Sequence, residues 1–209
     1  MLFLDELPEW DRRALEVLSE PLESGVVTIS RAARQSEFPA RFQLVAAMNP
    51  CPCGWAGDVS GRCRCSPDAI RRYRGRISGP LLDRIDLHVD VPRLPPAQLR
   101  PDAPEGECSA DIRARVEAAH RRQQQRAGRP NARLGQADTM AACRLSENDQ
   151  QLLERAIEAL QLSARAMHRI LRVARTIADL AGSDSIATVH LTEALGYRGL
   201  DRGLAAHAA

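Results

Sequence analysis

Short apolar runs of strand length occupy the first part of the chain, and longer apolar patterns with helical spacing occupy the rest. The short runs predict strands over residues 2–4, 26–30, 41–48 and 85–91, and helices over residues 9–23, 67–73 and 81–84. The longer patterns predict helices over residues 109–127, 146–160, 163–181 and 190–196. The chain is therefore predicted to contain part of an α/β domain followed by an all-helical domain.

A proline-rich segment, residues 93–107, separates the two predicted domains, and Pro92 directly precedes it. Such a segment is typical of a linker. We therefore place a partial α/β core at residues 1–92, the linker at 93–107 and a helical domain at 108–209. Within the helical domain, Ser146 and Ser163 are expected to cap helix starts, and Gly182 is expected to follow a helix end.

The composition is that of an ordinary globular protein, except that lysine is absent. All 29 basic residues are arginine, and the net charge of +2 is too small to predict a nucleic-acid partner by itself. Aromatic residues make up 3% of the chain, which argues against recognition of bases by stacking. No apolar stretch approaches the ~20 residues of a membrane span, and the first residues do not resemble a signal peptide. We therefore expect a cytoplasmic protein with no membrane partner.

The acid pair Asp5-Glu6 directly follows the first predicted strand. Ligands of α/β folds bind at the carboxyl ends of strands. In a phosphoryl-transfer site, one such acid holds Mg²⁺ and the other orients water. Surface acids after a strand end are the simpler interpretation, and these two residues alone favour it. The phosphate-binding motif G-x-x-x-x-G-K-[ST] requires a lysine, so it is either absent or upstream of Met1, and the abrupt first strand favours the upstream position.

Asn49 follows the apolar segment that ends at Met48. An amide at the end of a buried strand can orient the attacking water or contact the γ-phosphate of ATP. An Asn-Pro pair is equally typical of a turn. The acid pair at the end of an earlier strand favours the functional interpretation.

Residues 50–66 form a predicted loop rich in proline, glycine and cysteine, with two C-x-C pairs: Cys51, Cys53, Cys63 and Cys65. In a reducing compartment, clustered cysteines indicate a metal site or packing more often than disulfides. Four thiolates can close a tetrahedral structural Zn²⁺ site. The spacing differs from the usual C-x₂₋₄-C, so inert loop cysteines remain the alternative.

Arginines supply three further candidates. A dense basic patch either neutralises nucleic-acid phosphates or is a solvated helix face, and it consists of Arg71, Arg72, Arg74 and Arg76. Arg84 is flanked by apolar residues, so it is expected at a buried edge, where it can serve a neighbouring subunit's γ-phosphate as an arginine finger. Arg165 falls in the first turn of a predicted helix, where the helix dipole disfavours a cation, which indicates an anionic partner. Taken alone, Arg165 is better interpreted as an exposed arginine that tolerates a small penalty.

Five stretches, in this order, resemble the ComM/YifB family of bacterial AAA+ ATPases, which is magnesium-chelatase-like. They are Leu2-Phe3-Leu4-Asp5-Glu6-Leu7-Pro8-Glu9, Val27-Thr28-Ile29-Ser30-Arg31-Ala32, Ala47-Met48-Asn49-Pro50-Cys51-Pro52-Cys53-Gly54, Ser78-Gly79-Pro80-Leu81-Leu82-Asp83-Arg84-Ile85-Asp86 and Leu162-Ser163-Ala164-Arg165-Ala166. The resemblance covers the chain to about Arg198. It implies an α/β fold class, the C-terminal part of an AAA+ P-loop ATPase core followed by an all-α lid.

The resemblance also implies a role for each candidate residue. Asp5 and Glu6 match the Walker B acids, which bind Mg²⁺ and activate water for ATP hydrolysis. Asn49 matches sensor 1. Arg84 matches an arginine finger that acts in trans, and Arg165 matches sensor 2 in the lid.

Expected partners follow from the same resemblance. Residues 26–34 match an inserted β-hairpin that faces DNA in related helicases, so Arg31 and Arg34 are the expected DNA-binding residues. The family forms ATP-dependent homo-oligomeric rings, typically hexamers, and ComM-like members resemble branch-migration helicases of DNA uptake and recombination. Family members also carry a Lon-protease-like domain and a Walker A loop, which this sequence lacks. We therefore expect a fragment that does not hydrolyse ATP alone.

Three functions are therefore weighed. The first is a fragment of a DNA-remodelling AAA+ motor that uses ATP and Mg²⁺. The second is a non-catalytic, zinc-containing module that binds nucleic acid without nucleotide dependence. The third is a motor subunit of the magnesium-chelatase type, against which the cysteine loop argues because the resemblance assigns that loop to the ComM-like branch.

Overall fold

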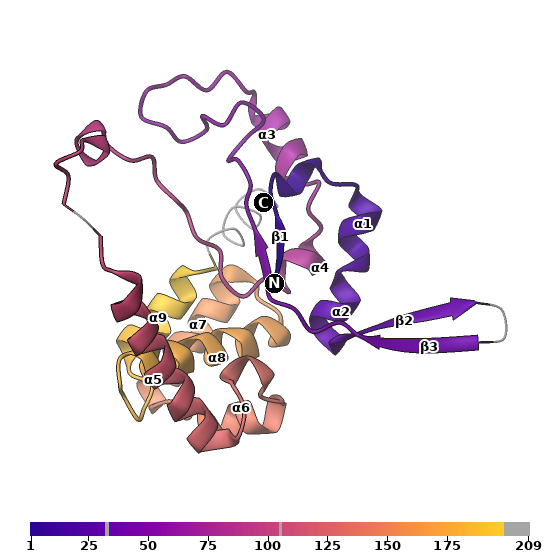
Figure 1. The fold of residues 1–209 in the computed structure, drawn as a ribbon, viewed down its shortest axis with the longest axis vertical. Coiled ribbons are helices and arrows are strands. Elements are labelled where there is room, and N and C mark those ends of the chain that lie inside the picture. Colours follow the sequence, from indigo (N-terminus) through magenta and orange to yellow (C-terminus); the bar gives the residue numbers. More distant parts are fainter. Residues whose placement is uncertain (32–33, 105, 199–209) are drawn as a thin grey trace. The chain divides into compact units, whose positions relative to one another are not determined.

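The computed structural model describes residues 1–31, 34–104 and 106–198 of the chain. The chain divides into two compact units, unit 1 (Met1–Ile85) and unit 2 (Asp86–Ala209). Figure 1 shows that unit 1 contains all the strands of the described residues, whereas unit 2 is helical. The mixed α/β composition agrees with the predicted fold class.

Unit 1 is built on two parallel strands, β1 (Leu2–Leu4) and β4 (Leu44–Ala46). Leu4 lies opposite Ala46, and the ladder continues beyond the strands through the Ala47 N–H, which donates to the Leu4 carbonyl at 2.9 Å. The predicted strand over residues 41–48 is therefore correct in place but too long. It is also not buried, since Val45 is 37% exposed. Two strands of three residues shield little surface, which explains that exposure.

The single helix predicted over residues 9–23 is wrong, because the segment forms two short helices, α1 (Arg12–Val17) and α2 (Ser19–Ser24). A 3₁₀ turn, η1 (Leu7–Glu9), precedes them. The Asp11 side chain caps α1 by accepting hydrogen bonds from two backbone N–H groups. Pro21 has no N–H to bond the carbonyl one turn earlier, so α1 cannot continue through it.

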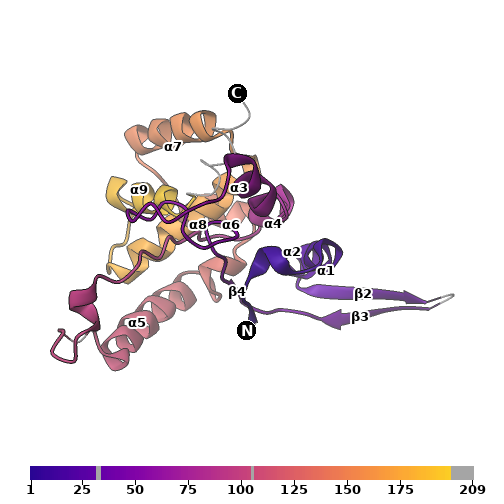
Figure 2. The same ribbon diagram turned by 90° about the horizontal axis from the view of Figure 1, so that it is seen from above.

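A β-hairpin follows α2, formed by the antiparallel strands β2 (Val26–Arg31) and β3 (Arg34–Pro39). Gly25 links α2 to the hairpin with a left-handed φ of 73°, and an added Cβ would lie 2.9 Å from Cγ of Arg41, so glycine is needed there. In both views, the hairpin extends beyond α1 and α2 within unit 1 (Figures 1 and 2).

The rest of unit 1 is the cysteine loop and two helices, α3 (Pro67–Arg74) and α4 (Gly79–Leu82). The Ser66 hydroxyl caps α3 by accepting from the Ala69 N–H at 3.2 Å. The small core of unit 1 consists of Leu4, Leu7, Leu15, Cys51, Tyr73, Ile77, Leu81 and Leu82.

The strand predicted over residues 85–91 is wrong, because these residues form no strand. The alternating residues Leu87, Val89 and Val91 are 48%, 63% and 86% exposed. No strand within the described residues pairs with this segment, so its alternating residues do not belong to a sheet.

Unit 2 is a helical bundle preceded by a short 3₁₀ turn, η2 (Pro96–Leu99). Its helices are α5 (Ser109–Ala127), α6 (Gln136–Ala142), α7 (Glu147–Leu160), α8 (Ala164–Leu180) and α9 (Thr188–Gly196), with a 3₁₀ turn η3 (Asn131–Arg133) after α5. The four predicted helices are confirmed, whereas α6 was not predicted. The caps at Ser146 and Ser163 are confirmed, and Gly182 follows α8 with a φ of 73°.

Helix α8 is the centre of unit 2 and packs against α5, α6 and α9 (Figure 2). One face supplies apolar residues to the core, including Ile170, Leu171 and Ala174. The same helix contributes Arg175 and Asp179, both at most 2% exposed. No helix of the described residues is long and apolar enough to cross a membrane.

Asp179 is neutralised inside the bundle by two arginines. Arg126 of α5 donates to its two carboxylate oxygens at 2.8 and 2.5 Å, and Arg175 lies 3.1 Å away. Asn131 donates to the same carboxylate at 2.9 Å. The pKa of Asp179 is lowered: burial alone would raise it, but the hydrogen bonds from Arg126 and Asn131 and the charge of Arg175 outweigh burial.

Candidate functional site

The acid pair and Asn49 are brought to the same edge of unit 1 by the parallel pairing of β1 with β4. Asp5 and Glu6 follow Leu4 directly, and Asn49 lies three residues after Ala46, the partner of Leu4. Parallel strands end on the same edge of their sheet, so the three side chains belong to one edge. The Leu7 N–H donates to the Ala47 carbonyl at 2.9 Å and holds the two segments together beyond the strands.

Both carboxylates remain accessible at this edge. Asp5 and Glu6 are exposed, and neither forms an ion pair with any residue that the structure describes. One Asp5 oxygen accepts the Glu6 N–H at 2.9 Å, and the Trp10 indole N–H donates to the Asp5 carbonyl at 2.9 Å. Carboxylate oxygens are the ligands that Mg²⁺ prefers, so the two residues fit a magnesium site.

Glu6 has a strained backbone. Its φ is 51° and its ψ is 47°, which is the left-handed region that side chains with a Cβ rarely adopt. This conformation turns the chain from β1 into η1 immediately after Asp5. Strained residues of this kind concentrate at functional sites.

Asn49 is exposed and is held from α3. Its backbone N–H hydrogen-bonds the Tyr73 hydroxyl, and Nε of Arg74 donates to the carbonyl of Pro50 at 3.1 Å. The pKa of Tyr73 is raised, chiefly by burial and then by the negative charge of Glu9, with the Asn49 N–H acting in the opposite direction. Sequence patterns did not single out Arg74 for this contact, because it looked like one member of a basic patch.

Arg84 is bonded within unit 1. Its side chain is 18% exposed, donates to the carboxylate of Glu23 at 2.6 Å and donates to the carbonyl of Pro80 at 2.7 Å. The expected position at a buried edge is therefore confirmed. Its role towards a neighbouring subunit remains a prediction.

The basic patch around α3 is largely used for internal contacts. Arg71 pairs with Asp68, Arg74 bonds the Pro50 carbonyl, and Arg76 pairs with Glu9 at 2.8 Å. Two members, Arg74 and Arg76, therefore hold segments of unit 1 together, whereas Arg71 pairs within α3 and Arg72 is exposed.

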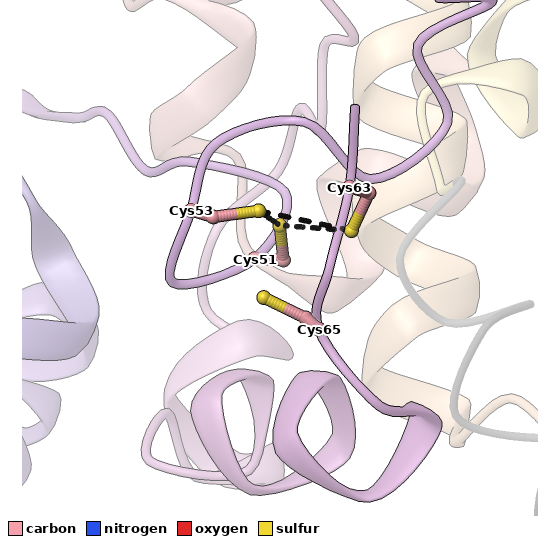
Figure 3. Close-up of side chains that lie close together, drawn as sticks. All are labelled: Cys51, Cys53, Cys63 and Cys65. Atoms are coloured by element: carbon pink, nitrogen blue, oxygen red, sulfur yellow. Dashed lines mark hydrogen bonds between the residues drawn. The ribbon is translucent and has the colours of Figure 1, made fainter. Parts of the chain in front are cut away.

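The four loop cysteines converge on one point, as Figure 3 shows. Their sulfur atoms all lie within 4.8 Å of one another. The Sγ atom of Cys51 lies 3.4 Å from that of Cys53 and 3.8 Å from that of Cys63, and the Cys53–Cys63 distance is 3.7 Å. All four thiols are free. The cluster is a candidate metal centre, because a tetrahedron with metal–sulfur bonds of about 2.3 Å has sulfur–sulfur edges of about 3.8 Å.

The pKa values of the cluster cysteines also favour a bound cation. The backbone N–H groups of Arg64 and then Trp55 hydrogen-bond the Cys53 sulfur and lower its pKa to about 6. For Cys65, the Cys53 N–H lowers the pKa, but hydrogen bonds with neighbouring thiols, burial and the charge of Cys51 outweigh it and raise the pKa to about 11. Crowded thiolates repel one another, so a bound cation is needed to hold all four deprotonated.

The remaining predicted residues are less defined. Arg165 is exposed in the first turn of α8, as expected, but belongs to unit 2. Arg31 and Arg34 end β2 and begin β3, and their side chains lie outside the described residues.

Two known protein families match successive parts of the chain. The family described as "Magnesium chelatase, subunit ChlI" matches residues 1–99, and "Magnesium chelatase, subunit ChlI C-terminal" matches residues 106–198. The two matches together include the acid edge, the cysteine cluster and the helical bundle.

Individual relatives agree with this assignment. The chain is 50% identical to the competence protein ComM of Haemophilus influenzae, over 97% of the chain and 39% of ComM. It is 48% identical to the uncharacterized protein YifB of Salmonella typhimurium and 47% identical to YifB of Escherichia coli, in each case over 97% of the chain and 40% of YifB. The chain thus spans about two fifths of the length of these relatives. It belongs to the ComM/YifB, magnesium-chelatase-like family of AAA+ ATPases.

Proposed function

We propose that this chain is the Walker B-to-lid part of a motor that couples ATP hydrolysis to the remodelling of DNA. The observation that carries the proposal is the common edge of β1 and β4, where two exposed carboxylates and an amide follow parallel strands. Side chains at such an edge are positioned for a nucleotide in α/β folds. The family to which the chain belongs supports the same activity.

Each residue then has a distinct task. Asp5 holds Mg²⁺, which when bound neutralises charge on the phosphates of ATP. Glu6 orients and deprotonates the attacking water. Asn49 donates to the γ-phosphate or to that water.

Two arginines complete the proposed reaction centre. Arg84 stabilises the transferring phosphoryl group of the neighbouring subunit in a homo-oligomeric ring, typically a hexamer. For this it must exchange its bond to Glu23 for one to phosphate. Arg165 contacts phosphate from the lid, at the start of α8.

DNA is the proposed substrate of the motor, and the hairpin of β2 and β3 is its proposed contact. The name of the competence protein ComM supports a role in DNA uptake for that relative. Arg31 and Arg34 would neutralise phosphates at the end of the hairpin. Replacing both with alanine is expected to reduce the salt dependence of DNA binding by roughly two phosphate contacts.

The ion of the cysteine cluster is proposed to be Zn²⁺. Four sulfur ligands and no water position match a closed structural zinc site. The expected content is one zinc per chain. Replacement with Co²⁺ is expected to give the strong visible bands of tetrahedral cobalt thiolate, and their absence would exclude the four-thiolate site.

The decisive experiment uses the native gene product. Its mass and amino-terminal peptides are determined first, and its ATP turnover is then measured with and without branched DNA. A product much larger than 23.0 kDa, with an upstream Gly-Lys-Ser or Gly-Lys-Thr and DNA-stimulated turnover, supports the motor. Absence of any ATP turnover in such a product contradicts it.

A second function is favoured by one specific observation, the cysteine cluster. A non-catalytic, zinc-containing nucleic-acid module would bind DNA with the same affinity whether or not ATP is present. A native product that begins at Met1, contains zinc and binds DNA in this way would support the module. A chelatase-type motor is the third candidate, and stimulation of turnover by porphyrin rather than DNA would favour it.

A further inference from the structure

The cysteine cluster is linked to Asn49 in two ways, along the chain and through α3. Cys51 is two residues after Asn49, and Cys65 is one residue before Ser66, the cap of α3. At the other end of α3, Tyr73 and Arg74 return to the backbone of Asn49 and Pro50. A metal that joins Cys51 to Cys65 therefore connects the Asn49 segment to the start of α3, while the end of α3 already contacts that segment.

The side chain of Asn49 also lies over the loop. A Cβ added to Gly54 would be 3.8 Å from Oδ1 of Asn49, and Gly54 adopts a left-handed φ of 77°. The Gly54 N–H donates to the Cys51 carbonyl at 2.9 Å, so this turn is part of the metal-binding segment. The backbone and the side chain of Asn49 are thus both next to the cluster.

The loop has no regular secondary structure. Residues 51–65 form no helix or strand, and Val59 at its tip is fully exposed. Cys51 is the exception, because it is 0% exposed. A long irregular segment inside a compact unit costs conformational entropy unless something fixes its base.

We infer that the metal-bound cysteine cluster positions Asn49 at the catalytic edge, so that occupancy of the cluster controls ATP turnover through Asn49. The cysteines are positioning residues in this inference, because they act through Asn49. The inference rests on the proposed ATPase activity for its kinetic consequence. Its structural consequence, a fixed Asn49 backbone, does not depend on that activity.

The test compares four forms of the full-length protein: wild type, Cys65→Ser, Cys65→His and Cys108→Ser. Histidine can replace cysteine as a zinc ligand, whereas serine does not. Cys108 is exposed and outside the cluster, so it is the matched control. Zinc content, amide hydrogen exchange and the kcat and KM for ATP are measured for each form.

Cys65→Ser is expected to lose zinc and to accelerate exchange of the Asn49 amide by about tenfold or more. Its kcat is expected to fall at least about tenfold while KM changes by less than about twofold, because displacement of a catalytic group affects the transition state most. Cys65→His is expected to retain zinc and restore both properties. Cys108→Ser is expected to match the wild type.

A double-mutant cycle shows whether the effect passes through Asn49. Cys65→Ser is expected to lower kcat less than about twofold in an Asn49→Ala background, because residues that act through one another are not additive. Fully additive losses would overturn the inference, as would a zinc-free variant with wild-type exchange and kcat.

Removal of zinc from the wild type with a chelator, followed by addition of zinc, covers the case in which Cys65→Ser does not fold. Exchange at Asn49 must rise on removal and return on addition. If the wild type does not hydrolyse ATP, the proposed function fails, but the exchange measurement still decides whether the metal positions Asn49. If the zinc-free wild type instead shows unchanged amide exchange at Asn49 and full ATP turnover, the inference fails but the proposed function does not.

Discussion

The two units contain carboxylates in opposite environments. In unit 1, Asp5 and Glu6 are exposed and have no ion-pair partner among the described residues. In unit 2, the Asp179 side chain is 0% exposed and has Arg126 and Arg175 within 3.1 Å. Under the proposed function, a carboxylate that serves the fold is neutralised within the chain, whereas those that serve a ligand remain accessible. The following predictions run from the largest expected effect to the smallest.

Arg84→Ala is expected to have the largest effect. It should lower ATP turnover of the assembled full-length protein by about 10³-fold or more, with ATP binding largely unchanged, because an arginine finger acts on transition-state charge. Turnover and nucleotide affinity are measured on rings and on monomers. Arg72→Ala, an exposed arginine of α3, is the control.

Mixing subunits tests whether Arg84 acts in trans. Arg84→Ala and Glu6→Gln subunits should each be inactive alone, but random mixed rings should regain about a quarter of their active interfaces. Mixed rings without any recovery would show that Arg84 and Glu6 serve the same subunit.

Glu6→Gln is expected to lower turnover by about 10²–10⁴-fold, because the group that orients and deprotonates water is lost. ATP should still bind, since Asp5 still holds Mg²⁺. The melting temperature should change little, because the Glu6 side chain is exposed. Turnover and thermal melting are measured together, with the exposed Glu16→Gln as control. Unchanged turnover would remove Glu6 from the reaction.

Asp179→Asn should show the opposite pattern, a loss of stability. It leaves the buried Arg175 without a counter-charge, which costs about 3–5 kcal/mol in the free energy of unfolding. Urea unfolding of unit 2 measures the loss. The control is Asp138→Asn, whose partner Arg129 lies 3.9 Å away with both side chains 54% exposed, and whose loss should cost less than about 1 kcal/mol. Equal losses in the two variants would contradict a special role for burial.

The pH dependence of unit 2 follows from the same carboxylate. Because the pKa of Asp179 is lowered in the folded state, its stabilisation is complete above the unfolded value of about 3.9 and is lost as pH falls through the folded pKa. Acid unfolding should therefore begin below about pH 4. In Asp179→Asn, this part of the pH dependence should disappear.

The smallest expected effect concerns two residues with a left-handed backbone, Glu6 and Gln161. Gln161 follows α7 with a φ of 50°, where glycine is favoured, so Gln161→Gly should stabilise unit 2 by about 0.5–1 kcal/mol without changing turnover. Glu6→Gly should stabilise unit 1 similarly but abolish turnover. Denaturant unfolding and ATPase rates separate strain kept for function from strain without such a role, and a loss of turnover in Gln161→Gly would contradict this separation.

Local patterns predicted much of the architecture. Helical spacing located α5, α7, α8 and α9, because an amphipathic face is visible in one short stretch of sequence. The pattern failed at residues 85–91, since alternation alone does not reveal whether a partner strand exists. It also failed at Leu18, where the apolar spacing concealed the break between α1 and α2.

Contacts between distant residues were harder to predict. The C-x-C pairs predicted a cysteine cluster, and the four sulfur atoms do converge. By contrast, the pairing of Arg126 with Asp179 joins α5 to α8 across a large sequence separation, and no sequence motif predicts it. The contact of Arg74 with the Pro50 carbonyl was not predicted for the same reason.

The convergence of the four cysteines at the base of their loop has a consequence for how the family can diversify. Within residues 54–62, Gly57 and Gly61 have no neighbour near their Cβ positions, so the tip is open to insertion or deletion. Changes there would alter what the loop presents to its surroundings, whereas the base stays anchored to β4 and α3. An evolving protein could thus acquire new contacts at the tip of the loop without disturbing the edge of β1 and β4, which is the proposed ATP site.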